Sequence, residues 1–127
     1  MKHFLKTTKT LFALAFVVFG MSMKAQTSED KILGKWTNED KTRVIEFVKN
    51  GTSYDAIIRK AENGGVIGKK QISGLKPSGE NNYVNGTVYI IKKSRTASCS
   101  AQITKDDLLN IKASYGMMSK TQVWTRL

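Results

Sequence analysis

The chain contains a single histidine, His3, and a single cysteine, Cys99. One cysteine cannot form an intramolecular disulfide, so packing alone must hold the fold together. His3 lies in an N-terminal segment that we expect to be removed on export. The mature protein would then lack the residues for Ser-His-Asp or Cys-His catalysis, for thiolate clusters and for histidine-based metal sites. We therefore expect no metal, no cofactor and no enzymatic activity.

Long apolar runs are also scarce, and the one unbroken run, Leu11–Val18, lies near the N-terminus behind several lysines. Even extended to Met21, this run is about 11 residues, well short of the roughly 17 to 25 that cross a bilayer as a helix. Small and polar residues follow it. This pattern predicts a signal peptide over residues 1–25, cleaved after Ala25. We expect a periplasmic or extracellular protein without a stable membrane span.

Acidic residues are few, with 10 against 21 lysines and arginines, which gives a formal net charge of +11. Residues 1–25 carry four lysines and no acid, so their removal leaves +7 on the remaining 102 residues. We expect these, residues 26–127, to form one monomeric domain. The lysines and arginines are spread along the whole chain, as expected for charges that keep a protein soluble. Export argues against nucleic acid and favours a small anionic or lipid-like partner.

Proline occurs once, at Pro77, and the mature chain shows a turn signal about every ten residues. Between the turns, segments rich in valine, isoleucine, threonine and tyrosine alternate in polarity. The clearest case is the pair Arg43–Val48 and Thr52–Lys60 around Asn50-Gly51, which predicts a tight hairpin with positive φ at both turn residues. In its second strand, one face carries Tyr54, Ala56 and Ile58.

The same alternation places Cys99 on the apolar face of a strand, so we expect it to be a small inward-facing residue. Thr104–Asp107 has the spacing of a helix-capping box, but the residues after it alternate, which favours a turn between strands. Asn85-Gly86 lies inside a strand and predicts a bulge. Eight strands follow in all, the remainder being the strand of Trp36 and the segments around Val66–Leu75, Tyr83–Ile91, Thr96–Ile103, Leu109–Tyr115 and Lys120–Leu127.

A sheet of eight antiparallel strands removes its two edges by closing on itself, which predicts an up-and-down barrel. Closure brings the first strand, with Trp36, against the last strand, with Arg126. We expect the guanidinium to lie over the indole, a cation-π contact of roughly 0.5 to 2 kcal/mol. Gly34 would let the chain pass close to that contact. Gly34, Trp36 and Arg126 are therefore the predicted closure residues.

Gly34-Lys35-Trp36 with an arginine on the last strand resembles the structural motif of the calycins, which include the lipocalins. The mature region as a whole is similar to the family called domain of unknown function 2147, small exported bacterial proteins. The similarity rests on LGKWTNED, GTSYDAIIRK, NGTVY and LLNIKASYG followed by TQVWTRL. The chain departs from that family at Tyr89-Ile90-Ile91, where Tyr-Asp-Pro is usual. The resemblance implies a lipocalin-like barrel and an exported location, and no established activity.

Two carboxylates, Glu46 and Asp55, lie on neighbouring strands of the predicted hairpin. Such a pair can act as general acid and base. Cross-strand ion pairs with Arg43 or Arg59 are the more common use of acids in this position, and we favour that interpretation.

An eight-stranded barrel is just wide enough either to be filled by its own side chains or to hold one small ligand. Tyrosines and Trp124 could line such an interior. The leading hypothesis is a non-enzymatic barrel that binds a small apolar or amphipathic ligand with an anionic head. The alternative is an envelope structural or protein-interaction domain with a filled core. The candidate ligand-binding residues are Tyr54, Tyr89, Tyr115, Arg43, Arg59 and Arg95.

Overall fold

The computed structural model describes residues 29–127, so the predicted signal peptide lies outside the described residues. The chain divides into two units, residues 1–31 and 32–127, and the fold below is that of the second. A short 3-10 turn, η1, spans Glu29–Ile32, and two more connect strands, η2 (Gly64–Val66) and η3 (Ile91–Lys93). The strands are β1 (Gly34–Thr37), β2 (Val44–Asn50), β3 (Ser53–Lys60), β4 (Lys70–Pro77), β5 (Asn82–Ile90), β6 (Arg95–Ile103), β7 (Leu108–Tyr115) and β8 (Met118–Arg126).

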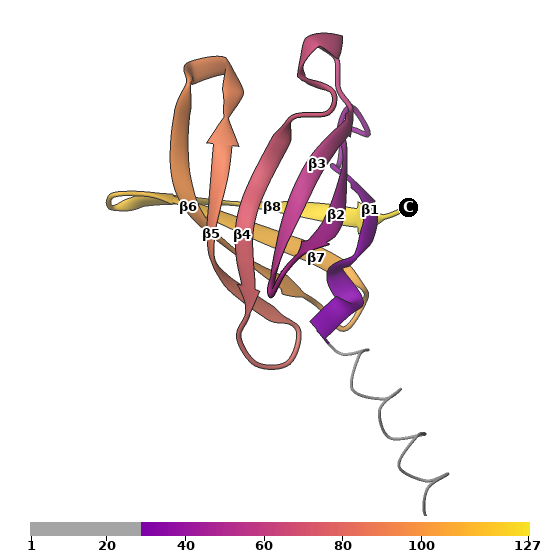
Figure 1. The fold of residues 1–127 in the computed structure, drawn as a ribbon, viewed down its shortest axis with the longest axis vertical. Helices are drawn as coiled ribbons and strands as arrows, with labels where there is room; N and C mark the ends of the chain where they lie inside the picture. Colours follow the sequence, from indigo (N-terminus) through magenta and orange to yellow (C-terminus); the bar gives the residue numbers. More distant parts are fainter. Residues whose placement is uncertain (1–28) are drawn as a thin grey trace, which may run out of the picture. The chain divides into compact units, whose positions relative to one another are not determined.

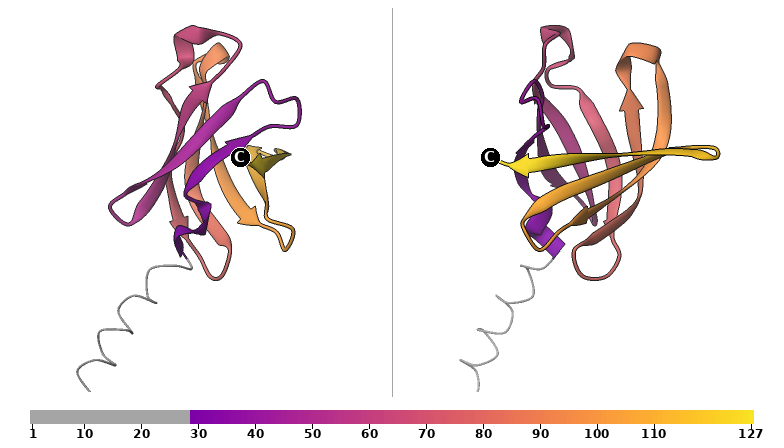
Figure 2. Two further views of the ribbon diagram at one scale, coloured as in Figure 1. Left: turned by 90° about the vertical axis from the view of Figure 1, so that its right-hand side faces the viewer. Right: turned by 180° about the vertical axis from the view of Figure 1, so that it is seen from behind.

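The eight strands form a closed antiparallel barrel in sequence order, with β1 joined to β8 (Figure 1). The predicted all-β, up-and-down architecture is confirmed. Closure is short, because only Trp36 and Thr37 of β1 pair with Arg126 and Thr125 of β8. The remainder of β8 pairs with β7 alone, and the two strands form a long hairpin that extends past the other strands (Figure 2).

Alternation along each strand decides which side chains fill the barrel. Tyr54, Ala56 and Ile58 of β3 are fully buried, as the sequence pattern predicts. Cys99 is buried on the inward face of β6, and burial raises the pKa of its thiol to about 11. The largest side chains of the core are Trp36, Tyr54, Tyr83, Phe47, Ile32, Ile45, Ile58, Ile72, Leu75 and Leu109.

The β2–β3 hairpin turns one residue later than its sequence predicts. Asn50 pairs with Ser53, so Gly51 and Thr52 occupy the centre of the turn and Asn50 belongs to the strand. Only Gly51 has positive φ, at 67°. A two-residue turn that needs positive φ at its first central position alone is of the II′ kind, in which glycine comes first. The expectation of positive φ at Asn50 was therefore wrong.

The expected strand around Val66–Leu75 begins four residues late, at Lys70. The preceding residues form η2, where the Asn63 side chain caps the turn by accepting a hydrogen bond from the Gly65 N–H at 2.9 Å. A local side-chain to backbone bond thus competes with strand formation. At Thr104–Asp107 the expected turn is present, and the Thr104 hydroxyl accepts from the Leu108 N–H.

Strand β4 contains a bulge opposite Asp55, where the register shifts and Gly74 takes φ of 74°. The bulge leaves the Gly74 N–H without a ladder partner, and the Asp55 carboxylate accepts it at 2.9 Å. Asn50 donates to the same carboxylate and Lys70 forms an ion pair with it at 3.2 Å. Burial by itself raises the pKa of Asp55, but these donors outweigh it and hold the pKa below its usual value.

The favoured partner for the other hairpin carboxylate, Glu46, is confirmed, since Arg59 bonds it at 2.9 Å. The partner expected for Asp55 was wrong, because Lys70 occupies that place and Arg43 bonds Gln71 instead. Asp55 lies opposite the β4 bulge, whereas Arg43 precedes β2 at the other end of the hairpin. Both carboxylates therefore have ion-pair partners.

Strand β5 is irregular at Asn85-Gly86, where its register against β6 shifts and Asn85 has φ of 61°. The predicted bulge is confirmed. Gly86 also has no room for a side chain: a Cβ there would lie 2.7 Å from Leu75 Cδ2 and 2.9 Å from Cys99 Sγ.

We expect Gly86→Ala to lower the free energy of unfolding by about 1 to 3 kcal/mol, because an added methyl group overpacks the core. Urea unfolding followed by circular dichroism measures the change. Gly64→Ala is the control, since nothing lies within 4 Å of a Cβ at that position, and it should leave the midpoint unchanged. Equal midpoints for Gly86→Ala and wild type would contradict the packing described.

Candidate functional site

One end of the barrel is closed by the contact between β1 and β8. The Arg126 guanidinium carbon lies 4.2 Å from the centroid of the Trp36 ring. Arg126 also donates to the Leu33 carbonyl at 3.1 Å and forms a bidentate salt bridge with Asp107 of the β6–β7 turn. The Trp36 indole N–H donates to the Ile32 carbonyl at 2.9 Å. Every polar group of this plug is therefore satisfied, and the barrel is filled here.

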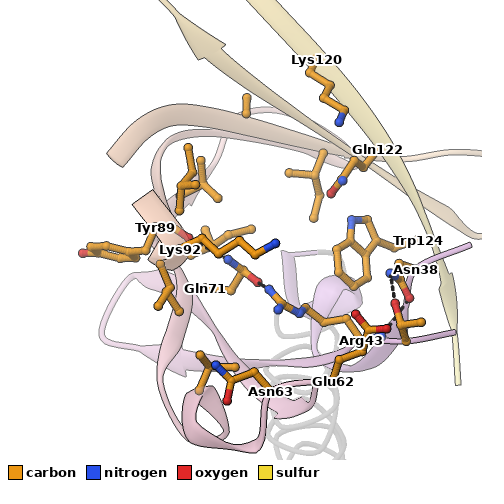
Figure 3. A pocket seen from close by; sticks show the side chains of 18 of the residues that line it. Asn38, Arg43, Glu62, Asn63, Gln71, Tyr89, Lys92, Lys120, Gln122 and Trp124 are labelled. Atoms are coloured by element: carbon orange, nitrogen blue, oxygen red, sulfur yellow. Dashed lines mark hydrogen bonds between the residues drawn. The ribbon is translucent and has the colours of Figure 1, made fainter. Parts of the chain in front are cut away.

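The opposite end contains a pocket of about 610 Å³. Its mouth lies among the β1–β2, β3–β4 and β5–β6 connections and the β7–β8 hairpin (Figure 3). The barrel is thus neither wholly filled nor wholly hollow, because large side chains occupy the closed end and stop short of the open one. The lining residues come from the β1–β2 and β3–β4 connections, which include η2, from η3, and from β4, β5, β7 and β8.

The wall of the pocket is apolar. Ile72, Val88 and Ile111 project from β4, β5 and β7, and Trp124 projects from β8. Ile72 and Trp124 are almost completely buried, at 1% and 4% exposure, so they also belong to the core. Such a wall takes the hydrocarbon part of a ligand by excluding water from both surfaces.

The rim of the pocket is cationic. Arg43, Lys92 and Lys120 line it, against a single acid, Glu62. Neither Lys92 nor Lys120 has an ion-pair partner among residues 29–127. Lys120 lies on the same face of β8 as Trp124, four residues before it in the strand. The two unpaired amines raise the local concentration of small anions at the mouth.

A polar chain fixes the position of Arg43. Its Nη1 donates to Gln71 Oε1 at 2.6 Å, and Gln71 Nε2 donates to the Tyr89 carbonyl at 2.8 Å. Arg43 directly precedes β2, Gln71 lies in β4 and Tyr89 in β5, so the guanidinium is held over the pocket with donors left for a ligand (Figure 3).

Trp124 carries an unmade hydrogen bond. Among the residues that the structure describes, its Nε1 is the one buried side-chain nitrogen or oxygen without a partner. A buried donor left unsatisfied costs about 1 to 3 kcal/mol. Its ring lines the pocket beside Gln122, which lies on the same face of β8 (Figure 3).

The structure brings three of the six predicted ligand-binding residues to this pocket: Arg43, Tyr89 and Tyr115. The Tyr89 ring points away from the cavity, and its hydroxyl lies 2.9 Å from the Ser73 hydroxyl (Figure 3). Tyr115 stands at the mouth, 42% exposed.

The other three lie elsewhere. Tyr54 is fully buried and packs edge-on against Tyr83 in the filled part of the barrel, with ring centroids 5.7 Å apart. Arg59 bonds Glu46 on the outer face of the β2–β3 hairpin. Arg95 is exposed at the start of β6 and is not part of the lining.

The lining residues that the sequence analysis did not predict include Gln71, Lys92, Lys120 and Gln122. Lys120, Gln122 and Trp124 occupy alternate positions of one strand, and that spacing was the available signal. The sequence contained no such signal for Gln71, near the start of a strand, or for Lys92, in a connecting turn. At those places the sequence pattern does not show which way a side chain points.

Within residues 29–127, no group of three or more histidine, cysteine, aspartate or glutamate side chains is placed to hold a metal ion. No helix in the same part of the chain is long and apolar enough to cross a membrane.

Comparison with known proteins gives two matches. A family model described as "Uncharacterized protein conserved in bacteria (DUF2147)" matches residues 34–126. Among solved structures, the chain is similar to protein HP1028 from the human pathogen Helicobacter pylori, described as belonging to the lipocalin family. That likeness has a TM-score of 0.63 and 18% sequence identity, and covers 76% of this chain and 82% of the other. No curated protein sequence matches.

Proposed function

Since the chain belongs to the uncharacterised bacterial family DUF2147 and has a lipocalin-like barrel, we propose that it binds one small amphipathic ligand with an anionic head. The observation that carries the proposal is the pocket at the open end, where an apolar wall meets a rim of three cations and one acid. Binding, rather than catalysis, is the function we infer.

The size of the pocket supports a single small ligand. Sites for such molecules usually measure about 300 to 1,000 Å³ and bury most of the ligand, and this pocket holds about 610 Å³. The hydrocarbon part would lie against Ile72, Ile111 and Trp124. Each methylene group removed from water there contributes about 0.8 kcal/mol.

The charge of the rim supports the anionic head. Arg43 is already oriented by Gln71, so little side-chain entropy is lost when it meets a carboxylate or phosphate. Among residues 29–127, Lys92 and Lys120 have no ion pair to give up. A cationic head would meet three like charges in the same place.

The unpaired indole N–H of Trp124 supports an oxygen on the ligand as well. A carbonyl, carboxylate or ether oxygen brought against the ring edge would complete the missing hydrogen bond. Export to the periplasm or beyond, inferred from residues 1–25, is part of the same proposal and would place the protein among envelope lipids and other amphiphiles.

We expect dodecanoate to displace the fluorescent probe 1-anilinonaphthalene-8-sulfonate at least tenfold more strongly than dodecan-1-ol, whose chain is the same length without the charge. The double variant Arg43→Gln, Lys120→Gln should lose this preference, because a charged hydrogen bond contributes about 1.5 to 3 kcal/mol. Trp124 fluorescence should change on binding, since its ring lines the pocket.

Arg95→Gln is the matched control, because Arg95 is exposed and outside the lining, and it should keep the preference for the carboxylate. Failure of both amphiphiles to bind, together with an empty pocket after lipid extraction of protein from its own cells, would overturn the proposal. It would leave the alternative of an envelope interaction domain.

A further inference from the structure

The tip of the β7–β8 hairpin exposes apolar side chains to a degree that folding does not explain. Met117 is fully exposed, Met118 is 73% exposed and Tyr115 is 42% exposed. We call Tyr115–Met118 the hairpin tip. Single exposed apolar residues are ordinary on protein surfaces, but adjacent ones at the end of a projection often mark a contact site.

The hairpin tip projects from the barrel. Because β1 pairs only with the last residues of β8, the start of β8 has β7 as its one neighbour and the two strands run outward together (Figures 1 and 2). The side chains of the two methionines are therefore not part of the barrel core.

The charges along the hairpin have one sign. From Leu108 to Arg126 the sequence contains Lys112, Lys120 and Arg126 and no acid. Arg126 is used at the closed end in its pair with Asp107. Lys112 and Lys120 remain without ion pairs among the described residues and point to opposite faces of the hairpin.

The spacing of apolar and cationic residues along the hairpin matches the distance between the acyl chains and the head groups at the surface of a bilayer. At about 3.3 Å per residue, Lys120 lies roughly 10 Å along the strand from Met117. Surface-bound amphipathic segments insert their apolar side chains about 5 to 10 Å, while lysines stay at the head groups and tyrosine lies between. Methionine can fill irregular space among acyl chains because it is unbranched and flexible.

We propose that the hairpin tip docks onto a lipid surface that carries anionic head groups. Tyr115 and Lys120 also line the pocket, so a docked barrel turns its mouth toward the membrane. An amphiphile then passes between bilayer and pocket without crossing water. This last step rests on the proposed function, whereas the docking itself does not.

The test is sedimentation with phosphatidylcholine vesicles that contain or lack phosphatidylglycerol, using the natural processed protein purified from its own cells. Wild type should bind the vesicles that contain phosphatidylglycerol and not the others, and added salt should weaken binding. The double variant Met117→Ser, Met118→Ser should bind at least tenfold more weakly. Lys112→Gln should bind several-fold more weakly.

Two control variants distinguish docking through the hairpin tip from non-specific binding to vesicles. Leu127→Ser removes an equally exposed apolar residue at the C-terminus, and Lys105→Gln removes a lysine from the β6–β7 turn; both should bind as wild type does. Neither methionine lines the pocket, so dodecanoate binding should be unchanged in the double variant. If the wild-type protein does not bind dodecanoate, the proposed function is overturned, whereas the docking inference still stands.

Absence of wild-type binding to the anionic vesicles would overturn the inference, as would equal binding by the double methionine variant. The same holds if Leu127→Ser weakens binding as much as the tip variant does. A wild-type dimer that the double variant converts to a monomer, without vesicle binding, would assign the tip to a second copy of this chain instead.

Discussion

Replacing Trp36 with alanine should lower the free energy of unfolding by about 3 to 5 kcal/mol. The ring is fully buried, and its loss leaves a cavity at the joint between β1 and β8. It also removes the face over which Arg126 lies and leaves the Ile32 carbonyl without its donor. Urea unfolding followed by circular dichroism would measure the loss.

The size of this effect follows from where the ring lies. Only two residue pairs join β1 to β8, so the backbone ladder contributes little to closure. The buried Trp36 ring, with Arg126 over it, contributes much. Tyr115→Ala is a suitable control, because that ring is 42% exposed and its removal should change stability by less than about 0.5 kcal/mol. An unchanged unfolding midpoint for Trp36→Ala would show that the barrel closes without its plug.

Replacing Asp55 with alanine should lower the free energy of unfolding by about 2 to 3 kcal/mol, because the Gly74 N–H at the β4 bulge loses its acceptor. Asp55→Asn keeps an oxygen at that position and should cost less. The Lys70 ion pair adds little to this loss, since that lysine is half exposed.

The same carboxylate predicts a dependence on pH. The pKa of Asp55 is lower in the folded barrel than in the unfolded chain, where it is about 3.9. Its contribution to stability is therefore fully present above that unfolded value and is lost as pH falls through the folded pKa. Wild type should lose more stability than Asp55→Asn on acidification below about pH 5. Parallel pH profiles for the two proteins would contradict the bonding described.

The strands of the barrel could be predicted from particular residues. The alternation at Tyr54, Ala56 and Ile58 fixed the inward face of β3, and Asn85-Gly86 marked a bulge that the structure contains. The errors were local. The turn after Asn50 moved by one residue, and β4 began late, because turns depend on one or two side-chain hydrogen bonds that strand patterns do not report.

The candidate site was harder to predict. Arg43, Lys92 and Lys120 come from three connections or strands far apart in the chain, and only barrel closure places them around one mouth. Arg59 and Arg95 carry the same charged group as Arg43 and also belong to strands with alternating polarity, or directly precede one, yet they lie outside the pocket. No pattern in the sequence distinguishes the cations that line the pocket from those that do not.

By itself, the sequence determined the all-β barrel, its order of strands and its family. The alternation of apolar and polar residues assigns the two faces of each strand locally, and Trp36 near the start and Arg126 near the end of the barrel are residues that can meet when the first and last strands pair. Only the tertiary structure decided that the closed end is filled while about 610 Å³ stays open at the other. The reason is physical: the space left inside a barrel depends on the stagger of all eight strands and on the summed volumes of side chains that no short stretch of sequence brings together.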